Sequence, residues 1–181
     1  ELRRYVERLR LVNEVHQALG RPIEQRELLG LILDKAFAHL RPQEGAIYLR
    51  DPHGGYACAA SRSSGGPGEA PFYSSHLVHE VAEKGLAALV LDVAQDERFA
   101  KAESMLVAGM RSLLAAPLMD LQGSLGMIVL GSKAAVRSFT EDDMDLLTSQ
   151  ASAAALRVRN VALAEEAAER RRLEREMTLA R

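Results

Sequence analysis

Two apolar runs decide the fold of this chain: Ser112-Leu113-Leu114-Ala115-Ala116-Pro117-Leu118-Met119 and Ser124-Leu125-Gly126-Met127-Ile128-Val129-Leu130. Each run has the length of a strand, and Asp120-Leu121-Gln122-Gly123 joins them as a short connection that ends in glycine. This is the pattern of an antiparallel β-hairpin. Pro117 has no N–H to donate to a ladder, so we expect it at a strand end, an edge or a bulge.

Further strand and helix patterns precede this hairpin. Residues 46–50 and 56–60 are strand candidates separated by a turn that contains two glycines. Residues 86–91 form another apolar run of strand length. Apolar residues at helical spacing predict helices over 24–40 and near 77–82. The order of these elements predicts an α+β fold with a central antiparallel sheet and flanking helices.

A long helix is predicted at the N-terminal end. Over residues 1–19 a seam of residues alternates between three and four positions apart, and Gly20 and Pro22 then end the helix. The seam consists of Leu2, Tyr5, Leu9, Val12, His16 and Leu19. Such spacing is typical of a helix that packs against a partner helix. The alternative is a surface helix packed on its own domain.

The last helix has a well-defined start. Thr140 and Asp143 form a capping-box pattern, and Phe139 and Met144 are spaced as a hydrophobic staple. No glycine or proline follows to end the helix, so we expect it to run to Arg181 as a rod of roughly 63 Å. A compact domain of this size has a radius of gyration of about 14 Å. The rod must therefore project beyond its own domain.

The composition of this last helix changes along its length. Its first half carries an apolar stripe made of Leu147, Ala151, Ala154, Val158 and Val161. Residues 165–181 are rich in Glu and Arg, which predicts a solvated linker helix or a weak coiled coil. Because a single globular domain would struggle to cover both terminal seams, we expect a homodimer held by the first and last helices as a four-helix bundle.

Composition excludes several classes of protein. The 181 residues carry a net charge of −2, and aromatic residues make up only 4% with no tryptophan, so a nucleic-acid partner is not expected. The single cysteine, Cys58, cannot form an internal disulfide, and no signal-peptide pattern opens the sequence. Residues 86–91 are too few to span a bilayer. We therefore expect a cytoplasmic protein with no membrane partner, cut from a longer polypeptide.

Residues 109–118 and 123–130 together resemble the core motif of the GAF family, in which an Arg-Ser pair precedes a Pro-Leu pair and a glycine-containing strand. Residues 91–99 resemble the stretch that precedes this motif in the family. The resemblance covers about residues 10–163. It implies a sensory and regulatory domain over 20–163, preceded by a dimerisation helix over 1–19 and followed by the start of a linker or coiled-coil helix over 164–181.

The cyclic-nucleotide members of this family carry an Asn-Lys, Phe, Asp-Glu signature. Lys133, Phe139 and Asp143 match it, whereas Ser132 and Met144 replace the Asn and the Glu. The resemblance therefore implies a structural bridge between Lys133 and Asp143, and it argues against binding of cyclic nucleotides. Bilin-binding members attach pigment through a cysteine near the pocket helix. Cys58 lies instead in an early strand pattern, so no covalent chromophore is expected.

One charged residue adjoins the apolar strand run, and it is the first candidate for contact with a ligand. Arg111 could face the cavity in which ligands of this family lie, or it could be a structural residue paired with Asp92 or Asp96. The candidate ligand-binding residues are Arg111, Ser112, Ser104, Asp92, Phe99 and Tyr73.

The patterns that mark catalytic and metal-binding sites are incomplete in this sequence. His76 and His79 lie three residues apart on an expected helix, but a zinc site needs three or four protein ligands. No Gly-x-Ser-x-Gly elbow and no Gly-rich phosphate loop with its Lys-Ser/Thr is present. We expect no enzyme activity, no cofactor and no metal.

Two functions are compatible with these sequence patterns. The first is a sensor whose unidentified small ligand biases the long C-terminal helix, and the second is a ligand-free dimerisation scaffold that positions an output domain of the same polypeptide. A cavity of roughly 300 Å³ or more with convergent polar groups would favour the sensor. Residues 173–181 resemble the helix that leads into metal-dependent serine/threonine phosphatase domains, and the central segment is similar to GAF domains that follow a forkhead-associated domain. A serine phosphatase, a kinase or a cyclase would be such an output.

Overall fold

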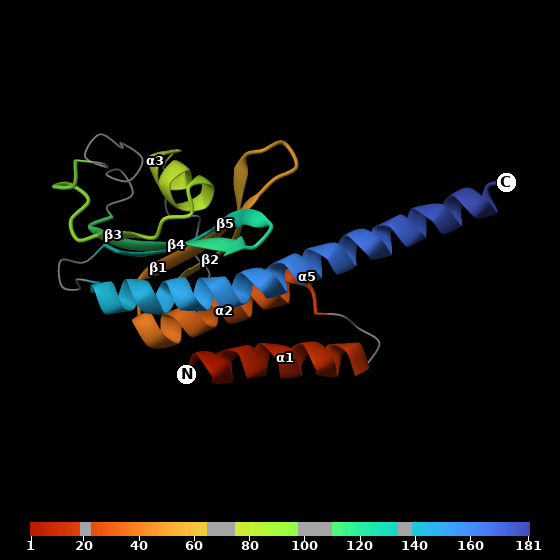
Figure 1. Cartoon of the computed structure of the whole chain (residues 1–181), viewed down its shortest axis with the longest axis horizontal. Helices are drawn as coiled ribbons and strands as arrows, with labels where there is room; N and C mark the ends of the chain where they lie inside the picture. The colour runs from red at the N-terminus through yellow and green to blue at the C-terminus, as the bar shows by residue number, and fades with distance from the viewer. Residues whose placement is uncertain (19–22, 65–74, 98–109, 134–138) are drawn as a thin grey trace.

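The computed structural model of the chain describes residues 1–18, 23–64, 75–97, 110–133 and 139–181. A five-stranded antiparallel sheet in the order β2-β1-β5-β4-β3 forms its centre (Figure 1). The elements in chain order are α1 (Leu2–Ala18), α2 (Gln25–Leu40), β1 (Glu44–Arg50), β2 (Tyr56–Ser63), α3 (Ser75–Leu77), the π-helix η1 (Val78–Glu83), β3 (Ala88–Val90), β4 (Ser112–Asp120), β5 (Gly123–Ser132) and α5 (Glu141–Leu179). The expected α+β class is confirmed.

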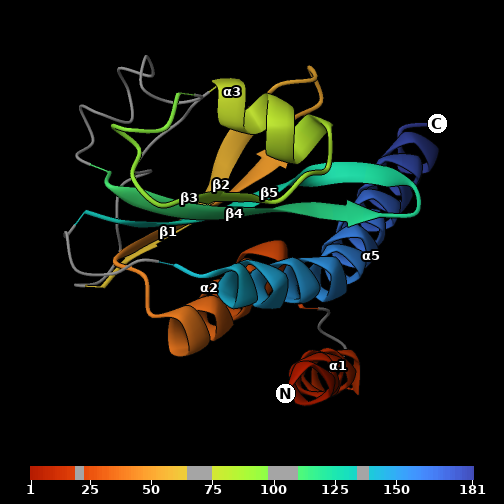
Figure 2. The same ribbon diagram turned by 60° about the vertical axis from the view of Figure 1, so that its left-hand side comes forward.

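Side chains alternate along each strand with a period of two, so every strand presents side chains to both faces of the sheet. Helices cover both of these faces (Figure 2). Figure 2 shows α2 and α5 against one face and α3 against the other, with α1 outside α2 and α5. Leu114 and Ala116 of β4 belong to the core on the side of α2 and α5. Leu113 and Ala115 belong to the core on the side of α3 and η1. Both faces of β4 are therefore apolar, which explains its continuous hydrophobic run.

The hairpin that decides the fold is present as expected. Asp120 pairs with Gly123 at its end, and Leu121 and Gln122 form the loop. The Asp120 carboxylate accepts a hydrogen bond from the Gln122 N–H at 2.8 Å, which stabilises the turn. Pro117 lies two residues beyond Ala115, the last residue of β4 that pairs with β3, so β4 is locally an edge at the proline.

The long helix α5 starts and extends as its sequence predicts. The Asp143 N–H donates to the Thr140 hydroxyl at 3.2 Å, and the Thr140 N–H donates to the Asp143 carboxylate at 2.9 Å, which completes the capping box. The helix continues for 39 residues, and Val161 is its last buried residue. The Gln25 N–H at the start of α2 donates to the Glu165 carboxylate of α5 at 3.2 Å, and the rest of α5 projects away from the sheet and the other helices (Figure 1).

Helix α1 packs on its own chain through part of the predicted seam. Tyr5 and Leu9 are each only 3% exposed and belong to the same core as α2 and α5. The Lys35 ammonium of α2 lies 5.6 Å from the centre of the Tyr5 ring. Leu2 and Leu11 remain exposed. At Tyr5 and Leu9 the seam thus packs on the chain's own domain, which was the alternative to packing against a partner helix.

Candidate functional site

The described residues of the predicted ligand site meet at one end of the sheet. The Arg111 N–H donates to the Ser132 carbonyl at 2.9 Å, and the Arg111 carbonyl accepts from the Val93 N–H at 2.7 Å. These bonds bring Asp92, Arg111 and Ser112 close together along the backbone. Ser104, Phe99 and Tyr73 lie outside the described residues.

The side chains of this group have different environments. Ser112 is buried, whereas Arg111 is exposed. The Asp92 carboxylate accepts from the Ala94 N–H at 3.1 Å, so it stabilises the turn after β3. Among the described residues no ion pair joins Arg111 to Asp92. The ligand-binding role of these residues remains a prediction.

The bridge expected between Lys133 and Asp143 is replaced by two separate contacts. The Lys133 ammonium lies 3.6 Å from the Glu44 carboxylate, and the Asp143 carboxylate accepts from the Thr140 N–H in the helix cap. The reason is the sheet register, because β1 pairs with β5 so that Glu44 lies opposite Gly131, two residues before Lys133. Lys133 therefore connects the end of β5 to β1, and among the described residues no ion pair joins it to Asp143.

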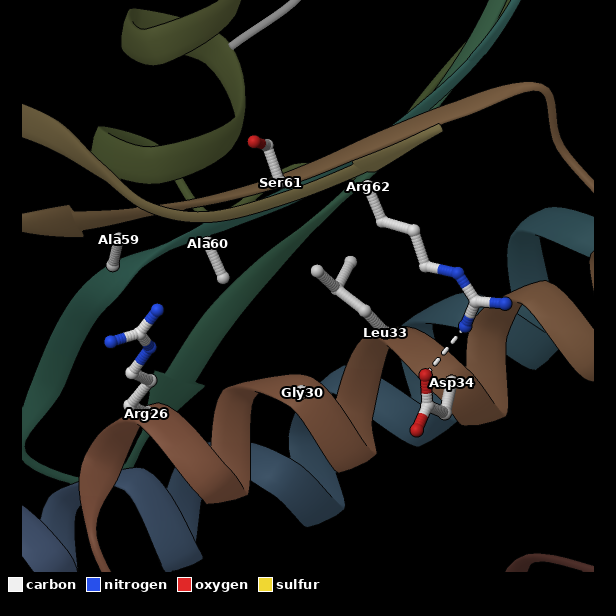
Figure 3. A pocket seen from close by; sticks show the side chains of 8 residues that line it. All are labelled: Arg26, Gly30, Leu33, Asp34, Ala59, Ala60, Ser61 and Arg62. Carbon is white, nitrogen blue, oxygen red and sulfur yellow. Dashed lines mark hydrogen bonds and ion pairs between the residues drawn. The ribbon is translucent and has the colours of Figure 1, made fainter. Parts of the chain in front are cut away.

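A groove between α2 and β2 has the geometry of a small-molecule site (Figure 3). Its volume is about 480 Å³, which is within the usual range for ligand pockets. It is lined by Arg26, Gly30, Leu33, Asp34, Ala59, Ala60, Ser61 and Arg62. None of these residues was singled out from the sequence. The available signal was an isolated glycine, Gly30, inside a helical pattern, which often has a packing or functional reason.

An ion pair fixes one end of this groove. The Arg62 guanidinium lies 2.5 Å from the Asp34 carboxylate and 4.6 Å from the centre of the Phe37 ring. These two contacts hold Arg62 in one position, because arginine stacks on aromatic faces while its planar fork pairs with a carboxylate. Arg26 is exposed at the other end, and in the part of the chain that the structure describes it has no hydrogen-bond or ion-pair partner.

A β-bulge shapes the wall that β2 contributes. Ile47 pairs with Ala60 and Tyr48 pairs with Cys58, so Ala59 is an additional residue with no partner in β1. A bulge redirects a side chain that would otherwise point to the other face of the sheet. In Figure 3 the methyl groups of Ala59 and Ala60 both lie on the groove side of β2. Two consecutive small apolar side chains therefore line the groove.

A second space lies where α5 leaves the domain. It measures about 600 Å³ and is bounded by the β1–β2 and β4–β5 loops, the start of α2 and the middle of α5. Arg159 of α5 pairs with Asp120 and donates to the Gly123 carbonyl at 3.5 Å. The hydrogen bond from Arg159 holds the pKa of Asp120 below its usual range. The β4–β5 hairpin is thereby tied to the helix.

Cys58 and His79 carry side chains that can in general act as a nucleophile or as a metal ligand. Desolvation raises the pKa of the Cys58 thiol, so the reactive thiolate is disfavoured. His79 lies 3.0 Å from Glu83 on the same helix, an exposed pair. Over the described ranges no group of three or more potential ligands could hold a metal ion. Over the same ranges, no helix combines the length and the apolar character needed to cross a membrane.

A sheet of order β2-β1-β5-β4-β3, with α2 and α5 on one face and α3 on the other, defines the class of GAF-type domains. The family model for the GAF domain matches residues 24–158, which is most of the chain. The chain belongs to the GAF domain family. The sequence matches no curated protein at a significant level.

Solved structures with the same fold include a photoreceptor and a domain of a sensor kinase protein. A far-red cyanobacteriochrome photoreceptor matches with a TM-score of 0.61 and 14% identity, covering 86% of this chain and 97% of the other. A domain of a protein described as a two-component sensor histidine kinase, from Sinorhizobium meliloti 1021, gives 0.58 and 19%, covering 79% and 95%. A GAF domain/HD domain protein from Geobacter sulfurreducens gives 0.59 and 14%, covering 78% and 96%. At these sequence identities the similarity shows a common fold and nothing about ligands or activity.

Proposed function

We propose that this GAF domain is a dimeric, cytoplasmic regulatory module of a larger bacterial signalling protein. A small ligand binds the domain and biases α5, and α5 carries the change to an output domain of the same polypeptide. The observation that carries this proposal is the course of α5, which is part of the domain core up to Val161 and then continues outside it to Leu179. One continuous helix would thus connect the sensory domain to the proposed output domain.

The exposed apolar residues of α5 support a dimer. Leu156, Leu163 and Met177 are 57%, 52% and 64% exposed, and they are spaced by seven and fourteen residues. Residues at multiples of seven occupy the same position of a heptad, so they form one stripe along the helix. Burying a side chain of this size against a partner contributes about 1.5 to 3 kcal/mol relative to leaving it exposed. A second copy of α5 would cover this stripe.

The groove between α2 and β2 supports the sensor over the ligand-free scaffold. Its volume of about 480 Å³ exceeds the threshold of roughly 300 Å³, and Arg26, Asp34 and Arg62 supply polar groups around it. Helix α2 packs on α5 within one core. A ligand against α2 would therefore act next to the helix that carries the signal.

Light scattering coupled to gel filtration tests the dimer. At tens of micromolar the wild-type chain should have the mass of two copies, and Leu163→Glu should lower it to that of one copy, because a charge replaces an apolar side chain in the stripe. Ala168→Glu is the matched control, since Ala168 is also exposed on α5 but lies on another side of the helix. It should leave the dimer intact. A monomeric wild-type chain would refute the proposal.

A further inference from the structure

We infer that the groove between α2 and β2 binds a small organic carboxylate with an apolar body, whose carboxylate pairs with Arg26. The inference names the ligand class for the proposed sensory function and so rests on it. It concerns a site within one chain, on the face of the sheet that α2 covers.

The charges of the groove select a ligand with one negative charge. Arg62 and Asp34 form an ion pair, so they neutralise each other. Arg26 is left as a cation without a partner among the described residues, and Figure 3 shows its guanidinium directed from α2 toward Ala59 and Ala60. A guanidinium binds a carboxylate through two parallel hydrogen bonds. A doubly charged phosphate would add a negative charge that no free cation among the described residues of the groove matches.

The walls select an apolar body next to that carboxylate. Leu33, Ala59 and Ala60 present carbon atoms to the groove, and the bulge in β2 is what brings both alanines to the same side. Gly30 leaves a gap in the surface of α2, since a Cβ atom placed there would have no heavy atom within 4 Å. Glycine inside a helix costs roughly 0.5–1 kcal/mol relative to alanine. The gap at Gly30 provides room for the apolar body of the ligand.

The position of the groove connects binding to α5. Leu29 and Ile32 of α2 are buried in the core that also contains Leu147 and Ala151 of α5. Arg26, Gly30 and Asp34 lie on another side of α2 and line the groove. A ligand that joins α2 to β2 therefore acts on the helix that packs against α5. A ligand can shift α5 only to the extent that it binds one arrangement of α2 and α5 more tightly than another.

The test is a titration of the isotope-labelled chain with 4-phenylbutyrate, which combines one carboxylate with a short apolar body. The NMR signals of the Ala59 and Ala60 methyl groups and of the Gly30 amide should shift together in a saturable manner. The neutral amide 4-phenylbutyramide and inorganic phosphate should produce no saturable shift at these residues. Shifts that cluster elsewhere, or equal shifts with phosphate, would overturn the inference.

Two variants and a control separate the parts of the argument. Arg26→Gln should weaken binding by at least about tenfold, because it removes the charge-assisted hydrogen bonds. Gly30→Leu should abolish binding by filling the gap, and its melting temperature should not fall. Arg3→Gln changes an exposed arginine on α1, outside the groove, and should bind as the wild type does. Unchanged affinity in both groove variants would refute the site.

Dimerisation is measured separately, so the two proposals can fail separately. Light scattering on the same samples reports the mass of the chain, whereas the titration reports a site formed by α2 and β2 of one chain. A dimer that binds no 4-phenylbutyrate at the groove would refute the ligand class alone. Saturable binding by a monomer would refute the dimer alone.

Discussion

The substitution Gly126→Ala should strongly destabilise the domain, because a side chain at this position would meet the backbone of the neighbouring strand. Gly126 has a φ of 150° and pairs with Leu49 of β1 and Leu118 of β4, between the central strands. A Cβ atom there would lie 1.9 Å from the Tyr48 carbonyl oxygen and 3.0 Å from the Leu49 Cα. Backbone atoms in the middle of a sheet cannot move aside independently, so β1 and β5 would have to separate.

The size of the effect follows from two costs. A non-glycine residue at an unfavourable positive φ costs about 1–3 kcal/mol, and overpacking in a core costs about 1–3 kcal/mol more. We therefore expect Gly126→Ala to lower the free energy of unfolding by about 2–6 kcal/mol. For a chain of this length 1 kcal/mol corresponds to about 2–4 °C, so the melting temperature should fall by roughly 4–24 °C.

Urea denaturation followed by circular dichroism measures this free energy. Gly30→Ala is the matched control, since the same atoms are added to a glycine whose Cβ would meet no heavy atom within 4 Å. It should raise the free energy of unfolding by about 0.4–1 kcal/mol through helix propensity and a less flexible unfolded chain. If Gly126→Ala unfolds within about 0.5 kcal/mol of the wild type, the close approach of the Tyr48 carbonyl is not a real constraint.

Three further predictions concern the hairpin, the helix cap and the ligand. The pKa of Asp120 is lowered in the folded state, so its ion pair with Arg159 contributes stability above about pH 4 that is lost as the pH falls through the folded pKa. Asp120→Asn should therefore reduce the decline of the urea midpoint between pH 5 and pH 3, and an unchanged decline would contradict this. Thr140→Ala should cost about 1 kcal/mol in denaturation experiments, because it removes the hydroxyl that accepts from the Asp143 N–H. Calorimetry with millimolar cyclic AMP and cyclic GMP should show no binding tighter than about 1 mM, since Ser132 and Met144 replace two residues of the family signature. A low-micromolar dissociation constant would make the domain a nucleotide sensor.

Features formed within a few residues could be predicted from the sequence. The capping box of Thr140 and Asp143 lies within four consecutive residues, and so does the β4–β5 turn from Asp120 to Gly123. Their hydrogen bonds form between neighbours whatever the rest of the chain does. The long course of α5 follows from the absence of residues that stop a helix. These local signals, with the apolar runs of β4 and β5, were sufficient for the fold class.

The partner of Lys133 shows where this reasoning fails. Asp143 has the spacing of a partner, but its carboxylate already accepts a hydrogen bond in the helix cap. Glu44 becomes the partner because β1 and β5 pair in one register, although the two residues are far apart in the sequence. Strand register depends on all the side chains of both faces at once. A motif within one segment of the sequence carries no information about the register between two strands.

The sequence by itself determined the α+β class, the resemblance to the GAF family and the projecting helix, because periodicity, caps and turns are properties of short segments. Only the tertiary structure decided that Arg26 and Gly30 of α2 face Ala59 and Ala60 of β2 across a groove. That arrangement requires the extra residue in β2 and the packing of α2 on the sheet. Both are set by contacts between distant segments, whose free energy is gained only when the whole core closes.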